Sequence, residues 1–206
     1  MGAVMAAEAR QQPERATPEN WMCPPDDGWT YDQVKDLDLP FDWELVGGRI
    51  VVRGVPVWWH QLVRDELYFR LRQVRPSNYM INNEQAVHFD KGNVPKPDLT
   101  VFTKDGLGVR APVIPVENVV LAVEIVSPGS RTDDRFLKPA LYAQAGIDYY
   151  WRIEQGEDDV PEVHEFWRDP EAGMFVPSPE RRLHTGTLKT HVPFPIEVEL
   201  RSLIDF

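Results

Sequence analysis

The longest hydrophobic run in the chain is VVLAVEIV, residues 119–126, and its only polar member is Glu124. Apolar residues that do not alternate with polar ones are typical of a strand covered on both faces of a sheet. A buried carboxylate without a partner is costly, so it normally takes up a proton or acquires a cation or a hydrogen-bonded base. The run therefore predicts a buried strand whose acid needs a partner.

A turn and a helix are predicted directly after this strand. Residues 127–130, Ser-Pro-Gly-Ser, are turn formers, and Thr132 or Asp133 can cap a helix that Gly146 ends. Pro139 costs a helix one hydrogen bond unless it lies in the first turn. We therefore expect a late helix start, or a kink about three residues before this proline.

Three other patterns lie upstream. Apolar residues alternate on both sides of Gly47-Gly48, which predicts a two-residue hairpin turn. Residues 96–102, KPDLTVF, predict a strand from their β-branched and aromatic content, with Asp98 just inside it. Residues 57–75 predict a helix, because apolar side chains recur on one stripe. The stripe consists of Trp59, Val63, Leu67, Leu71 and Val74.

The remaining segments complete a fold class. IDYYWRIE reads as an aromatic central strand, and the segments after it indicate further antiparallel strands with an edge-like end. We predict an α/β (α+β) protein with one mixed central sheet of five or more strands, helices on both faces and a C-terminal antiparallel extension. Residues 28–206 would form this single domain, and residues 1–27, rich in Pro, Glu, Gln and Ala, a loose tail.

Composition limits the class of protein. The 206 residues, 42% of them hydrophobic, suffice for one core. The single cysteine, Cys23, excludes an internal disulfide and a thiolate zinc cluster, which fits a reducing cytosol. No apolar run reaches the length of a transmembrane helix. We expect a cytoplasmic protein with no membrane partner.

The charge is unevenly distributed. The net charge of −11 argues, taken whole, against a nucleic-acid partner. Residues 46–155, however, hold 12 acidic against 14 basic side chains, so the excess acid lies at the two ends. The segment with the candidate site is mildly basic, and phosphate binding is compatible with it.

Asp98 and Glu124 lie on strands separated by one loop. If these strands are neighbours, the two carboxylates converge at about one strand spacing, roughly 5 Å. Two such anions can stay ionised together if a divalent cation bridges them, and oxygen ligands favour Mg²⁺ or Mn²⁺. With Lys138 on the following helix, this is the equipment of phosphodiester hydrolysis. The alternative is that Asp98 caps a turn and Glu124 pairs privately with Lys138, or that Lys138 pairs with Asp134 along the helix.

Three side chains could contact phosphate. Arg64 belongs to an arginine cluster away from the apolar stripe, where a solvated face is the simpler explanation. Ser130 and Thr132 stand at the helix start, where N–H groups can bind a phosphate. A serine hydrolase is a remote alternative, because Ser127 and Ser130 lack a Gly-x-Ser-x-Gly elbow.

VPKPDLTVF, followed by AVEIVSPGSRTDDRFLKPALYAQAGIDYYWRIE, resembles the Uma-two family of restriction-endonuclease-like proteins within the PD-(D/E)XK nuclease superfamily. The resemblance is strongest over residues 95–154. It implies a restriction-endonuclease-like fold in which Asp98 and Glu124 bind metal and Lys138 is the lysine on the helix. Val126 stands where the superfamily has its strand lysine.

The same resemblance adds two residues upstream. Glu44 matches the family's upstream glutamate, although Gly48-Arg49 follows where the family often has Gly-Glu. His60 falls where the family often has a histidine; from its place in the apolar stripe it is by default a core histidine with one hydrogen bond.

The function expected from residues and resemblance together is a Mg²⁺-dependent (or Mn²⁺-dependent) endonuclease, acting on DNA as a homodimer. The alternative is a catalytically degenerate nuclease-like fold that serves as a non-enzymatic binding or assembly module. The charge of −11 and the absence of a lysine beside Glu124 favour that alternative.

Overall fold

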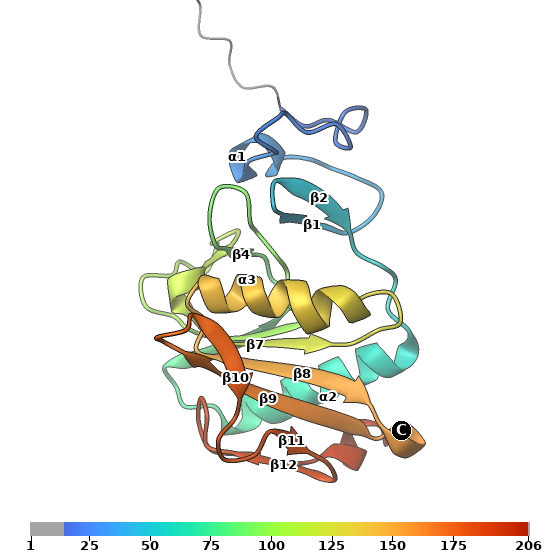
Figure 1. Cartoon of the computed structure of the whole chain (residues 1–206), viewed down its shortest axis with the longest axis vertical. Helices are drawn as coiled ribbons and strands as arrows, with labels where there is room; N and C mark the ends of the chain where they lie inside the picture. Colours follow the sequence, from blue (N-terminus) through green and yellow to red (C-terminus); the bar gives the residue numbers. More distant parts are fainter. Residues whose placement is uncertain (1–14, 206) are drawn as a thin grey trace, which may run out of the picture.

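The computed structural model describes residues 15–205, which are built around one mixed sheet of seven strands (Figure 1). Its strands are β3 (Tyr79–Asn83), β5 (Leu99–Thr103), β7 (Val119–Ile125), β8 (Tyr149–Gln155), β9 (Pro161–Asp169), β10 (Met174–Pro177) and β11 (Leu183–His184). Six lie in the order β10-β9-β8-β7-β5-β3, and β11 pairs with β9. β7 and β8 run parallel, whereas the other neighbours run antiparallel. The predicted fold class is confirmed.

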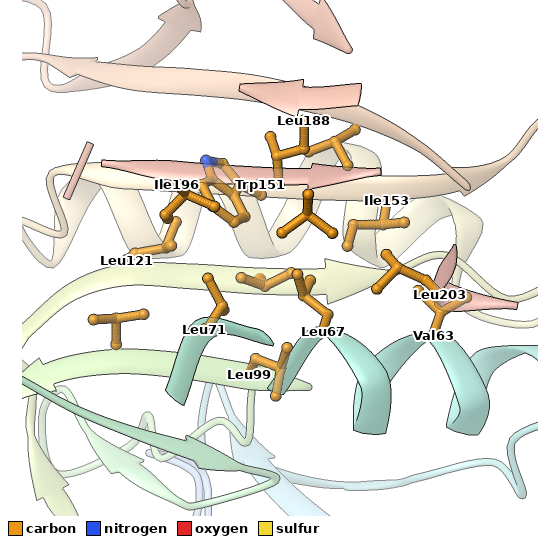
Figure 2. Packing of buried hydrophobic residues seen from close by; sticks show 14 of the residues in the cluster. Val63, Leu67, Leu71, Leu99, Leu121, Trp151, Ile153, Leu188, Ile196 and Leu203 are labelled. Atoms are coloured by element: carbon orange, nitrogen blue, oxygen red, sulfur yellow. The ribbon is translucent and has the colours of Figure 1, made fainter. Parts of the chain in front are cut away.

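Helices cover both faces of the sheet, as the apolar patterns predict (Figure 1). On one face lies α2 (Trp58–Val74), which buries Val63, Leu67 and Leu71 completely. Figure 2 shows these three side chains directed toward sheet residues such as Leu121. The opposite face is covered by α3 (Lys138–Gln144), whose Tyr142 packs in a second core cluster.

The C-terminal segment closes the core on the α2 side. Here β12 (Thr187–Thr190) and β13 (Ile196–Glu199) pair antiparallel in a small separate sheet, followed by the 3₁₀ turn η4 (Leu200–Leu203). Leu188 and Ile196 from these strands join the cluster of α2 (Figure 2). This is the predicted antiparallel extension, and it contributes apolar area to the main core.

The N-terminal part forms a smaller layer above one end of the sheet (Figure 1). The hairpin is β1 (Trp43–Val46) and β2 (Arg49–Val52), joined by Gly47-Gly48 with φ of 57° and 69°. Both values lie in the left-handed region that a two-residue type I′ turn requires at its two central residues, and glycine adopts this region at little cost. The helix α1 (Tyr31–Val34) precedes this hairpin.

The remaining short elements lie further along the chain. They are β4 (Val87–His88), β6 (Ile114–Pro115), η1 (Val116–Asn118) and η3 (Glu157–Asp159).

The predicted tail, residues 1–27, is described only in part, because residues 1–14 lie outside the described chain. Residues 15–27 contact the domain. The Ala16 N–H donates to the Gln33 carbonyl at 3.1 Å, and the Trp29 indole donates to the Trp21 carbonyl at 2.9 Å.

An irregular turn precedes α3. Asp133–Leu137 form a π-helical turn, η2, which leads directly into α3 with Pro139 as its second residue. A proline lacks the N–H that would continue a regular ladder, and a widened turn accommodates that loss. The irregularity lies where the kink is predicted. Within residues 15–205, no helix is long and apolar enough to cross a membrane.

Candidate active site

The pairing of β5 with β7 brings the two predicted acids together. The strands are antiparallel, with Leu99 opposite Val123. Asp98 immediately precedes β5, so its position in this register is beside Glu124. Its Oδ2 accepts a hydrogen bond of 2.8 Å from the N–H of Ile125, the residue after Glu124. The condition set from the sequence, that the two strands are neighbours, is met.

Two basic side chains hold the carboxylate of Asp98. His60 Nε2 lies 3.1 Å from Oδ2, and Arg53 Nη2 lies 3.1 Å from Oδ1. Burial raises the pKa of Asp98, but the hydrogen bond and charge of His60, together with Lys138 and the Ile125 N–H, outweigh it. The pKa of Asp98 therefore lies below its usual range, and the group is ionised at neutral pH.

Glu124 has a different environment, although it is equally buried. Lys138 Nζ lies 3.0 Å from its Oε2, and the Tyr142 hydroxyl donates to its Oε1. Burial is the largest influence and raises the pKa of Glu124 well above its usual range; Lys138 opposes this, and Asp98 adds to it. Glu124 therefore needs a positive charge to remain ionised.

Lys138 lies among three carboxylates. Besides Glu124, its Nζ approaches Asp134 Oδ1 at 3.3 Å and Glu44 Oε1 at 3.9 Å. Burial lowers the pKa of a lysine, but the three acids together hold the pKa of Lys138 above its usual range. Both ion pairs considered as alternatives from the sequence are thus present at once. Asp134, Lys138 and Tyr142 are spaced by four residues, which places them on one face of the η2–α3 helix.

The structure gathers six predicted residues around one cavity of about 520 Å³. They are Glu44, His60, Asp98, Glu124, Ser130 and Lys138. Glu44 enters from β1, where its Oε2 accepts from the Lys96 N–H at 2.9 Å. His60 makes the single hydrogen bond expected of a core histidine, but its partner is the site acid Asp98, and its Nδ1 has no partner within the described residues.

Of the three predicted phosphate contacts, Ser130 lines the cavity, whereas Thr132 and Arg64 do not. The Ser130 hydroxyl accepts from the Ser127 N–H at 3.0 Å. Thr132 is exposed. The expectation of a solvated face for Arg64 is wrong, since this residue is only 9% exposed. It lies one helical turn after His60 on the inner side of α2, where Glu84 supplies a carboxylate 2.9 Å from its Nη1.

Two neighbours of the acids, Tyr142 and Arg53, were missed from the sequence, and Asp134 was considered only as an ion-pair partner of Lys138. Tyr142 stands four residues after Lys138, and this helical spacing was the available signal. Arg53 follows β2 in the sequence, and nothing in the local pattern connects it with Asp98, 45 residues away.

The donor chemistry of the site fits a hard divalent cation. Four buried carboxyl groups outnumber three basic side chains at the cavity; the acids are Glu44, Asp98, Glu124 and Asp134, and the basic residues are Arg53, His60 and Lys138. In the described chain, no three or more His, Cys, Asp or Glu side chains are arranged to hold a metal. Mg²⁺, however, is usually bound through one or two carboxylates, with waters and substrate phosphates completing its shell. Asp98 and Glu124 meet that requirement.

Comparison with known proteins places this site in a family. The family model described as "Uma2: Putative restriction endonuclease" matches residues 31–184, which include all the acids of the site. The chain belongs to the Uma2 family. Membership supports a nuclease-like function for the protein.

A solved structure supports the fold of this Uma2 member. It is a crystal structure described as a putative nuclease belonging to DUF820 from Anabaena variabilis, with a TM-score of 0.63 and 17% sequence identity. The similarity covers 84% of this chain and 96% of that one, so the two share a fold over most of their lengths. None of the curated proteins compared with the chain matches it significantly.

Proposed function

We propose that the protein is a Mg²⁺- or Mn²⁺-dependent endonuclease that hydrolyses phosphodiester bonds in DNA. The observation that carries this proposal is the β5–β7 register, which sets Asp98 beside Glu124 with Lys138 3.0 Å from the latter. Asp98 and Glu124 would hold the metal ion. When bound, such an ion polarises a phosphate and lowers the pKa of a water ligand.

The protein groups around the acids have distinct tasks in this proposal. Asp98 stays ionised because His60 and Arg53 face it. The Tyr142 hydroxyl fixes the orientation of the Glu124 carboxylate. Lys138 retains its proton and lines the cavity, where its ammonium can donate to a phosphate oxygen and stabilise the negative charge that develops there.

The surrounding residues would position the nucleic acid. Glu44 adds negative charge to the metal side of the site. Ser130, Thr132 and Arg64 remain the proposed phosphate contacts, and Ser130 has the best support because it lines the cavity. Cutting both strands of a duplex suggests a homodimer, which sedimentation of the protein with and without DNA tests.

The test is cleavage of duplex, single-stranded and branched DNA with Mg²⁺ or Mn²⁺ supplied. We expect cutting that stops on chelation and is lost in Asp98→Asn and Glu124→Gln. Glu66→Gln, a change of the same charge on the outer part of α2, should cut normally. Metal-loaded wild-type protein that cuts none of these substrates would contradict the proposal.

A non-enzymatic binding or assembly module is the second candidate. One observation favours it: the Lys138 ammonium already lies between Glu44, Glu124 and Asp134, so the acids are partly neutralised without a metal. Titration calorimetry with Mn²⁺ separates the two functions. Binding that disappears in Glu124→Gln supports the nuclease, whereas wild-type protein that binds no ion supports the module.

A further inference from the structure

Two arginines converge on one glutamate at the edge of the cavity. Arg64 Nη1 lies 2.9 Å from Glu84 Oε2, and Arg53 Nη1 lies 3.5 Å from Glu84 Oε1. Each carboxylate oxygen therefore faces a different guanidinium group. The Glu84 carboxylate is thus an anion that both arginines share.

The arginines are covered and the anion is accessible. The side chains of Arg53 and Arg64 are 14% and 11% exposed, whereas that of Glu84 is 38% exposed and lines the cavity. If the Glu84 side chain left, Arg64 Nη1 and Arg53 Nη1 would lose this partner, while Arg64 Nε would keep Asp65 and Arg53 would keep Asp42 and Asp98. Because α2 holds Arg64, and Arg53 is tied to Asp98 at 3.1 Å, the two cations would stay in place.

The position of this shared anion relative to the acids is also defined. Arg53 Nη1 lies 3.2 Å from Asp42 Oδ2 and 3.5 Å from Glu84 Oε1, and its Nη2 contacts Asp98, so one guanidinium group connects Glu84 with Asp98. The Glu84 N–H also donates to the Asp98 carbonyl at 3.2 Å. An anion in the place of the Glu84 carboxylate would therefore be a direct neighbour of whatever Asp98 holds.

The backbone conformation of Glu84 is also unusual. Its φ is 50°, a left-handed value that is uncommon for a residue with a Cβ. Such conformations persist where the surrounding structure enforces them, and they gather at functional sites and switch regions. The side chain of this residue is the one that Arg53 and Arg64 face.

We propose that Glu84 is an internal substitute for a nucleic-acid phosphate and that Arg53 and Arg64 form a phosphate subsite beside the scissile position. Carboxylate and phosphate accept the same paired N–H donors from guanidinium groups, so one can replace the other. Glu84 swings toward solvent when the backbone phosphate next to the reacting one enters. This subsite rests on the proposed function, because its ligand is the strand that the acids would cut.

Because Glu84 occupies the proposed subsite, free phosphate ions compete with it for Arg53 and Arg64. An isolated phosphate must displace Glu84 with no other gain, whereas a strand that also contacts the metal side of the cavity gains both interactions. The predicted result is weak binding of free phosphate and stronger binding of polymer.

The test measures binding without cleavage, by fluorescence anisotropy of a short labelled DNA duplex in EDTA. Glu84→Gln should bind about tenfold more tightly than wild type, and the slope of log affinity against log salt should steepen by about one phosphate contact. Glu66→Gln is the matched control, since Glu66 pairs with Arg70 and has the same 38% side-chain exposure. It should bind as wild type does.

A second variant guards against a general charge effect or misfolding. Arg64→Gln in the Glu84→Gln background should remove the gain, with circular dichroism confirming that the double variant is folded. Glu84→Gln that binds no more tightly than Glu66→Gln overturns the subsite, even if wild type cuts DNA. A gain in Glu84→Gln that needs Arg64 supports the subsite, even if wild type cuts nothing and the proposed nuclease function fails.

Discussion

Two buried glutamates in the same sheet show how surroundings separate a structural acid from a candidate catalytic one. Glu124 on β7 and Glu165 on β9 are both 1% exposed. Glu165 accepts hydrogen bonds from the Trp167 indole at 2.7 Å and the Thr190 hydroxyl at 3.3 Å, and His184 Nε2 lies at 3.0 Å. Both carboxylate oxygens of Glu165 therefore have hydrogen-bonding partners within the protein.

The pKa values of the two acids shift in opposite directions. Burial raises the pKa of both, but the donors around Glu165 hold its pKa below the usual range. The pKa of Glu124 is held well above it, because burial and the neighbouring Asp98 outweigh Lys138. A buried acid surrounded by donors stabilises the fold, whereas a buried acid beside other acids destabilises it when ionised. This destabilisation distinguishes Glu124, at the candidate active site, from Glu165.

The largest expected contrast is in cleavage. Glu124→Gln should lower the rate of metal-dependent DNA cutting by about a hundredfold or more, because a metal ligand and its charge are lost. Glu165→Gln, assayed at a temperature where it is folded, should cut at nearly the wild-type rate. Equal losses in both variants would show that the two acids do not differ in role.

Stability should show the reverse order. Glu165→Gln should lower the free energy of unfolding by about 2 kcal/mol, because an amide N–H then faces donors that a carboxylate had satisfied. Urea unfolding followed by tryptophan fluorescence measures this loss. An unchanged midpoint and slope would mean that the Glu165 cluster is not structural.

A smaller effect of opposite sign is expected at the site. In metal-free protein at pH 8, Glu124→Gln should raise the free energy of unfolding by about 1 kcal/mol, since one buried acid leaves a cluster that already has an excess of acids. Lys138 keeps Asp134 and Glu44 as partners in this variant. Thermal unfolding in EDTA checks the sign, and clear destabilisation would contradict it.

The smallest effect is a pH dependence of the structural acid. The folded-state pKa of Glu165 is lowered, so its stabilising contribution is present above the unfolded-state pKa and is lost as pH falls through the folded-state pKa. The stability difference between wild type and Glu165→Gln should therefore be constant near neutral pH and shrink in acid. Unfolding curves of both proteins from pH 7 downward measure it; a difference that grows in acid would reverse the assignment.

Sequence reasoning could identify Glu124 but not Glu165. Glu124 is the only polar residue in the apolar run 119–126, and Asp98 lies just inside the second predicted strand, residues 96–102. Glu165 stands in the mostly polar stretch EVHE, where an acid does not stand out, and His184 in a segment without a pattern. Their pairing crosses β9 and β11, and no local spacing connects them.

Local pattern by itself determined the helix α2, the hairpin at Gly47-Gly48, an irregular turn before Pro139 and the presence of an acid in the buried strand β7. Each of these depends on side-chain periodicity or backbone chemistry within a few residues. Periodicity selects the face of a strand but not the neighbour of that strand. Tertiary structure alone therefore decided that Asp98 would lie beside Glu124 and that Arg53 would connect Asp98 with Glu84, because the charges that set the chemistry of each acid come from segments far away in the chain.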